Sequence, residues 1–192
     1  MMKPGTAQQG VALIEALIAM LIVAFGILGL VGLQARTTVA NLEAYQRSQA
    51  LILVNDMAER INLNRASAAS YVSDDIGATS LGDCTEESLT HAQKDLCEWS
   101  NAIQGAGEVQ GDPKVKVGAM LDARGCITSP AADFYQVSIA WQGIQPTGAP
   151  VDTCGKNDFS SESMRRTVSV VAQIGSLLVT TPVLPPPPLP SP

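Results

Sequence analysis

Apolar residues form one long run near the start of the chain. From Val11 to Leu33 the run has 23 residues, and Glu15 is its only charged residue. An α-helix rises about 1.5 Å per residue, so a helix of this length matches the roughly 30 Å hydrocarbon core of a bilayer. The pattern therefore predicts a membrane-spanning helix over residues 11–33.

Three glycines repeat at three-residue spacing in the second half of this run. Small residues let helix backbones approach closely, which would favour packing against neighbouring helices. Glycine is also simply common in membrane helices, and the sequence leaves both interpretations open for Gly26, Gly29 and Gly32.

Beyond Leu33 the apolar positions change to the spacing of an amphipathic helix. Residues 34–65 contain neither Pro nor Gly. Charged pairs four residues apart, Glu43 with Arg47 and Asp56 with Arg60, stand in the order that supports a helix. We predict one helix over residues 11–64, whose second part packs on a soluble domain. Its apolar stripe recurs about every 3.7 residues, at Ala35, Val39, Leu42, Tyr45, Ala50, Leu53, Met57 and Ile61.

The following part, residues 66–180, alternates irregular segments with short helical and strand patterns. Apolar residues spaced for one face predict a helix over residues 92–104, with Trp99 and Trp141 as core or rim residues. Alternation of apolar and polar residues over most of their length predicts strands over residues 134–142 and 166–174.

A further hairpin is predicted upstream of these strands, with residues 115–121 and 124–127 flanking a turn at Asp122–Gly125. The pattern as a whole indicates an α+β fold, in which a small antiparallel sheet of about four strands covers the amphipathic helix. The last segment, residues 181–192, is dominated by Pro and predicts an exposed, polyproline-like tail.

Composition argues against a nucleic-acid-binding protein. The chain has 12 Lys and Arg residues against 18 Asp and Glu residues, a net charge of −6. Nucleic-acid-binding surfaces are basic, so no nucleic acid is expected as a partner. Aromatic residues make up only 4%, so the core must depend on Val, Ile, Leu and Ala.

No set of residues forms a candidate active site. Ser, His and acidic residues do not form a recognisable nucleophile set, and no Gly-rich phosphate loop is present. His91, the only histidine, has no partner at metal-ligand spacing. We therefore expect no catalytic residue, no cofactor and no metal site, which favours a binding or structural protein.

Four cysteines lie beyond the predicted membrane helix: Cys84, Cys97, Cys126 and Cys154. Their spacing includes no C-x-x-C, which argues against a zinc site and for disulfides in an oxidising compartment. Four cysteines allow three pairings, and the sequence leaves all three open. We favour Cys84–Cys97, which closes the helix that carries Trp99, and Cys126–Cys154, which ties the hairpin to the loop after the next strand.

Glu15 needs a compensating group, because an ionised carboxylate within lipid costs about 3 kcal/mol on insertion scales. If the chain were cut after Gly10, Glu15 would lie just over one helical turn from a new amino terminus at Val11. The ammonium group there, or the free N–H groups of the helix end, would then compensate the charge. A secretory signal peptide has a shorter apolar core, and an ordinary signal anchor explains neither Gly10 nor Glu15.

This arrangement resembles the class III signal of type IV pilins and the related pseudopilins. The polar leader, residues 1–10, ends in Gly, and Glu15 is the fifth residue after it. The resemblance implies cleavage after Gly10 by prepilin peptidase, N-methylation of Val11 and an assembly role for Glu15. Val11 stands where Phe or Met is usual, and Ala12 where Thr or Ser is frequent.

Four shorter stretches resemble the PilV-type minor pilins, the type IV pilus modification proteins: residues 40–51, 56–61, 125–127 and 140–143. The resemblance implies the pilin fold and a role in pilus assembly or initiation. It implies other minor and major pilins, prepilin peptidase, the inner-membrane assembly machinery and the lipid bilayer as partners. The chain would first be a single-pass inner-membrane protein with its C-terminal domain in the periplasm, and then part of the pilus.

These inferences divide the chain into five segments. Residues 1–10 are the prepilin leader, 11–33 the transmembrane and assembly helix, and 34–65 its amphipathic extension. Residues 66–180 form the periplasmic domain, and residues 181–192 the tail. Two alternatives remain. A type II secretion pseudopilin carries the same signal, and a membrane-anchored periplasmic enzyme or binding domain would keep an uncleaved signal anchor.

Overall fold

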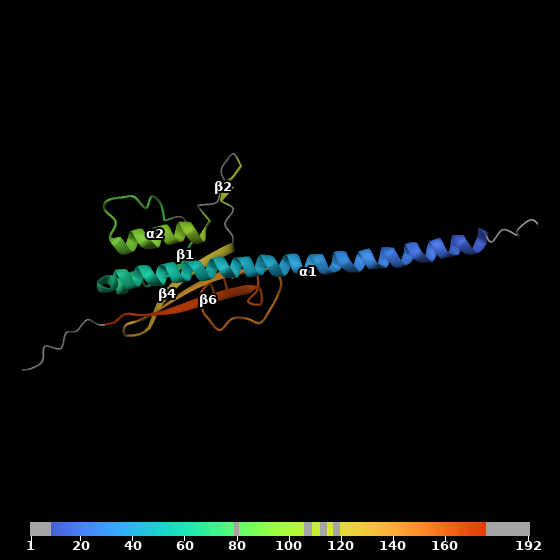
Figure 1. Cartoon of the computed structure of the whole chain (residues 1–192). Coiled ribbons are helices and arrows are strands. Elements are labelled where there is room, and N and C mark those ends of the chain that lie inside the picture. The colour runs from blue at the N-terminus through green and yellow to red at the C-terminus, as the bar shows by residue number, and fades with distance from the viewer. Residues whose placement is uncertain (1–8, 79–80, 106–108, 112–114, 117–119, 176–192) are drawn as a thin grey trace, which may run out of the picture.

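The computed structural model describes residues 9–78, 81–105, 109–111, 115–116 and 120–175 (Figure 1). Most of the predicted leader and the whole Pro-rich segment 181–192 lie outside the described residues. In chain order the elements are α1 (Gln9–Leu63), the 3₁₀ helix η1 (Arg65–Tyr71), β1 (Ser73–Ile76), α2 (His91–Ile103), β2 (Val109–Gln110), β3 (Val115–Lys116), β4 (Leu121–Ala131), β5 (Phe134–Gln142) and β6 (Arg165–Gln173).

The architecture is the predicted α+β fold. Four antiparallel strands form a sheet in the order β1-β4-β5-β6, and the second half of α1 packs on β5 and β6. Figure 1 shows the first half of α1 projecting far beyond the domain. The helix predicted over residues 11–64 is therefore confirmed as a single α-helix.

The core lies where α1, α2 and the sheet meet. Fully buried side chains come from all three layers, and each large one contributes about 1.5–3 kcal/mol relative to an exposed position. The Trp99 indole N–H donates to the Leu53 carbonyl at 2.9 Å and so joins α2 to α1. Members of this cluster include Val54, Met57, Ile61, Trp99, Ile103, Ile127, Val137, Ile139 and Trp141.

The predicted stripe on α1 is correct only in its C-terminal part. Ala50, Met57 and Ile61 are buried, whereas Leu42 and Tyr45 are 49% and 47% exposed. The face that the sheet covers begins at the partly buried Val39 and continues through the partly buried polar residues Glu43 and Gln46 instead. Apolar character alone therefore placed the stripe slightly off the covered face.

The hairpin turn predicted at Asp122–Gly125 is wrong. These residues lie inside β4, where Asp122 has a φ of 51° and the register to β5 shifts between Leu121 and Arg124. A residue in the left-handed region produces a β-bulge here, and a bulge shares its residue preferences with a turn. The true turn joins β4 to β5 at Asp133, which has a φ of 63°.

The segment predicted to pair with residues 124–127 has a different partner. Val115 and Lys116 form β3, which pairs with β2 as a separate two-stranded sheet. Along β4, Gly125 lies against α2, because a Cβ there would come within 2.5 Å of the Trp99 ring. This close approach accounts for glycine in the middle of a strand.

The two remaining helix and strand predictions are close to the structure. α2 begins one residue earlier than predicted, after a capping box in which Thr90 and Gln93 exchange hydrogen bonds. β5 and β6 pair along their whole length without a register shift, from Phe134 opposite Gln173 to Gln142 opposite Arg165.

Candidate functional site

The apolar first half of α1 is the largest exposed apolar surface that the structure describes. Its large side chains between Val11 and Leu33 are all more than half exposed. The most apolar window of this helix has a mean hydropathy of 2.8 and no buried residue. Within the described ranges, only this helix is long and apolar enough to cross a membrane. Apolar surface of this extent indicates a lipid or protein environment, and the helix fits membrane anchoring.

Glu15 lies inside this exposed apolar band, on the same continuous helix as Gly10 and Val11. No described side chain of the domain reaches it, because the domain begins to cover α1 only near Val39. A charge compensation for Glu15 must therefore come from outside the domain. Cleavage after Gly10 and pairing with a Val11 ammonium group stay predictions.

The three glycines of this band face open space. A Cβ placed on Gly26, Gly29 or Gly32 would meet no atom within 4 Å. The single chain therefore leaves room for a neighbouring helix at these positions, and it leaves both interpretations of the glycines open.

Glu43 fastens α1 to the end of the sheet. Its Oε1 atom accepts a hydrogen bond from Arg166 of β6 at 3.2 Å and from the backbone N–H groups of Ile144 and Gln145 at 3.2 and 3.3 Å. From the sequence we expected Glu43 to pair with Arg47 along the helix. Its partners instead are residues about one hundred positions later, which a local pairing rule does not detect.

A second polar cluster joins the C-terminal end of α1 to α2. The Arg60 guanidinium contacts Asp95 at 2.9 Å, Glu98 at 2.7 Å and Asp56 at 3.0 Å. The predicted pair of Asp56 with Arg60 is thus present. Burial lowers the pKa of Arg60, but the hydrogen bonds to Glu98 and Asp95 outweigh this effect and leave the pKa raised.

Asp95 is buried and receives three partners. Besides Arg60, the Tyr71 hydroxyl donates to Asp95 Oδ2, and His91 Nδ1 lies 3.0 Å from the same oxygen. Burial of the phenol and its bond to Asp95 raise the pKa of Tyr71 to about 12. His91 therefore has a structural neighbour one helical turn away, and among the described residues no group of three His, Cys, Asp or Glu side chains is arranged to hold a metal ion.

Both disulfides are formed in the pairing that we favoured. Cys84 is bonded to Cys97, with Cα atoms 5.6 Å apart, and Cys126 to Cys154, with Cα atoms 5.7 Å apart. The first ties the segment before α2 to that helix, and the second ties β4 to the loop between β5 and β6. Such loops gain about 3 kcal/mol each in the chain-entropy model.

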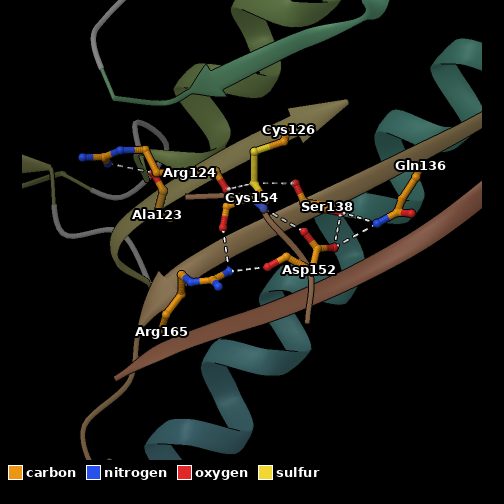
Figure 2. The surroundings of a disulfide bond; sticks show 8 residues. All are labelled: Ala123, Arg124, Cys126, Gln136, Ser138, Asp152, Cys154 and Arg165. Carbon is orange, nitrogen blue, oxygen red and sulfur yellow. Dashed lines mark hydrogen bonds between the residues drawn. A yellow bond between two sulfur atoms is a disulfide. The ribbon is translucent and has the colours of Figure 1, made fainter. Parts of the chain in front are cut away.

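The loop around Cys154 is also held by a buried arginine that the sequence analysis missed. Arg165, only 1% exposed, donates to the carbonyl oxygens of Asp152 at 2.6 Å and Cys154 at 2.9 Å (Figure 2). Its guanidinium also pairs with Glu162 at 2.6 Å. The only sequence signal was Glu162 three residues before a strand that begins with two arginines.

Asp152 completes this arrangement from the other side. Its Oδ2 atom accepts from Ser138 at 2.7 Å and from Gln136 at 3.0 Å, and its Oδ1 atom accepts from the Cys154 N–H at 2.8 Å (Figure 2). A hollow of about 270 Å³ beside the disulfide is lined by these side chains. Each carboxylate oxygen of Asp152 thus has at least one donor, which holds the loop against β5.

Comparison with known proteins supports a type IV pilin family for this chain. Residues 32–100, 69 of the 192 residues, match the Tt1218-like family model, described as "Type IV pilin Tt1218". The match runs from the end of the apolar band through most of α2 and does not include the Gly10 and Glu15 motif. No curated protein and no solved structure matches the chain. The resemblance to type IV pilins is thus supported at the level of the family.

Proposed function

We propose that this chain, as a protein of a type IV pilin family, is a minor pilin that supports the assembly or initiation of the type IV pilus. The observation that carries the proposal is the wholly exposed apolar half of α1, with Gly10 before it and the lone Glu15 inside it. The proposed role is structural, because the exposed apolar half of α1 would contact lipid before assembly and other pilin helices after it.

Processing is the first step of the proposed mechanism. Prepilin peptidase cuts after Gly10 and methylates Val11, which removes residues 1–10 as the leader. Glu15 then compensates the ammonium group of Val11, in its own chain or in a neighbouring pilin, while residues 11–33 still lie in lipid. This directional pairing fixes the axial register, and the apolar helices bundle as the filament core.

The two disulfides support the proposed topology. Disulfides persist in an oxidising compartment, so Cys84–Cys97 and Cys126–Cys154 favour residues 66–180 in the periplasm and the leader in the cytoplasm. Residues 34–65 extend the helix into the domain, and residues 181–192 form the tail. The proposed partners are minor and major pilins, prepilin peptidase and the inner-membrane assembly machinery.

The mature amino terminus tests this proposal. We expect mass spectrometry of the chain from membrane and sheared-pilus fractions to find a terminus at Val11, and Gly5→Ala in the leader should not change it. Glu15→Ala should give a stable, processed membrane protein that joins pili poorly. A chain that still starts at Met1, in cells with active prepilin peptidase, would refute processing, and normal assembly of the Glu15 variant would refute the role of Glu15.

A type II secretion pseudopilin is the second candidate, because the same Gly10 and Glu15 motif serves both systems. Deletion distinguishes them: loss of pili with intact secretion supports the minor pilin, and the reverse supports the pseudopilin. The third candidate function is that of an enzyme or binding domain on an uncleaved membrane anchor. This candidate requires an amino terminus at Met1.

A further inference from the structure

The loop after β5, residues 143–148, forms the edge of the domain nearest to the exposed half of α1. It is held against the helix by the two N–H groups that donate to Glu43. Gln145 also lines a groove of about 430 Å³ together with Arg36, Val39 and Ala40 of α1. In Figure 1 this end of the sheet lies where α1 leaves the domain. The loop is therefore held at Glu43, and Gln145 lines a groove that extends back along the helix to Arg36.

The depth of this groove follows from the helix rise. Arg36 is three residues beyond Leu33, about 4.5 Å along the axis, and Glu43 is about 15 Å beyond it. The headgroup layer of a bilayer is roughly 5–7 Å thick on each side of the hydrocarbon core. If residues 11–33 span the core, the groove begins inside the headgroup layer at Arg36 and ends about 8–10 Å outside it at Glu43.

The charges in the groove favour an anion. The carboxylate of Glu43 is compensated by Arg166 and by two backbone N–H groups. Among the described residues, none of the ion pairs involves Arg36. Its guanidinium is thus an available partner for a phosphate at headgroup depth.

The end of the domain that faces the membrane also carries exposed apolar side chains. Ile144 is 42% exposed in the loop itself. Leu121, 58% exposed, lies at the same end of the sheet, opposite Gln142 in the register of β4 and β5. Apolar side chains beside a cation are typical of a surface that rests on the membrane interface.

We propose that the groove between α1 and the loop of residues 143–148 binds the headgroup of an anionic phospholipid through Arg36, which holds this loop within about 10 Å of the headgroup layer. The inference rests on the membrane placement of residues 11–33 in the proposed function. It adds a second lipid contact, made by the domain, to the contact made by the helix. The domain is then seated on the bilayer in one rotational orientation before it leaves the membrane.

Fluorescence quenching in vesicles tests this placement. A nitrobenzoxadiazole label would be attached to single added cysteines in the full chain, with the native cysteines left in their disulfides. The vesicles contain phosphatidylcholine with or without an equal amount of phosphatidylglycerol, and a nitroxide is carried on the lipid headgroup or along the acyl chain. Ile144→Cys reports the loop, Phe25→Cys the helix in the hydrocarbon core, and Ala132→Cys the exposed turn at the other end of β5, roughly 30 Å away.

We expect the headgroup nitroxide to quench the label at position 144 and not at position 132, and the acyl-chain nitroxide to quench the label at position 25. Quenching at position 25 without quenching at position 144 would overturn the inference and leave membrane anchoring intact. The groove would then be free for a neighbouring protein. Absence of quenching at position 25 would overturn both the inference and the membrane placement on which it rests.

Lipid selectivity tests the role of Arg36 separately. Native mass spectrometry of the detergent-solubilised chain, titrated with phosphatidylglycerol and with phosphatidylcholine, gives the affinity for each lipid. Arg36→Gln should weaken phosphatidylglycerol binding roughly fivefold, the effect of one cation near an anionic surface. The control Arg47→Gln, three turns further from the membrane, should leave it unchanged. Equal losses in the two variants, or none in either, would refute binding through Arg36.

Discussion

Replacing Arg165 by Leu should destabilise the domain more than replacing any exposed charged residue of the same loop by Leu. Arg165 is 1% exposed, and its donors satisfy the carbonyls of Asp152 and Cys154 and the carboxylate of Glu162. In the variant, the carbonyl oxygens of Asp152 and Cys154 lose these donors at a buried position. The Glu162 carboxylate also loses its partner, but it can be hydrated instead. Leucine fills most of the volume, so the change tests the hydrogen bonds rather than a cavity.

The expected magnitude follows from these contacts. Losing the donor to a buried carbonyl costs about 1–3 kcal/mol, and breaking a buried ion pair about 3–5 kcal/mol. Glu162 is partly exposed, which reduces the second contribution because water replaces the lost partner. We therefore expect a loss of about 3 kcal/mol in the free energy of unfolding, or a decrease of roughly 10 °C in Tm.

Thermal unfolding of the full chain in detergent, followed by near-ultraviolet circular dichroism, measures this effect under non-reducing conditions. Lys156→Leu is the matched control, because it removes an exposed cation from the same loop. We expect its Tm to stay within about 2 °C of the parent, as for most surface substitutions. Equal Tm values for Arg165→Leu and Lys156→Leu would show that the disulfide alone holds the loop and that the buried hydrogen bonds add nothing.

Two further predictions concern α2 and its surroundings. The raised pKa of Tyr71, about 12 against an ordinary value near 10, means that folding favours the neutral phenol, so its contribution to stability is complete below pH 10 and is lost as the pH rises towards 12. An alkaline absorbance titration should show one tyrosine ionising near pH 12 that is missing in Tyr71→Phe; loss of a step near pH 10 instead would contradict the burial of this hydroxyl beside Asp95. Gly125→Ala places a Cβ within 2.5 Å of the Trp99 ring and should cost about 1–3 kcal/mol in unfolding free energy, whereas Gly148→Ala, with no atom within 4 Å, should be neutral in the same denaturant titration. An unchanged midpoint for Gly125→Ala would mean that α2 moves away from β4 without cost.

Patterns with a strong period predicted their elements well. The run from Val11 to Leu33 has only one charge, and β5 and β6 alternate along most of their length, so each specified one structure. The stripe on α1 was less reliable upstream of Ala50. A helix turns by about 100° per residue, and two exposed apolar residues, Leu42 and Tyr45, were enough to move the inferred face by part of a turn.

The features that the sequence did not reveal depend on contacts between distant segments. Asp122 has the composition of a turn, and only its pairing with β5 makes it a bulge inside β4. The partners of Glu43 lie in the loop after β5 and in β6, and Arg165 is buried because the same loop folds over it. Hydrogen bonds to backbone atoms leave no trace in side-chain spacing, which is why these three residues needed the structure.

Because α1 is continuous, the proposed role of Glu15 would also affect the domain outside the membrane. After Gly10, glycine occurs in α1 at positions 26, 29 and 32, and residues 34–63 contain neither Gly nor Pro. Any bend that glycine permits therefore falls inside the apolar half, where neighbouring helices would pack. Beyond it the helix is stiff, and Glu43 fixes its rotation relative to the sheet. An axial register set at Glu15, as proposed above, would be carried about 42 Å along the helix to Glu43, so that assembly in the membrane would also determine how the surface of the domain is presented.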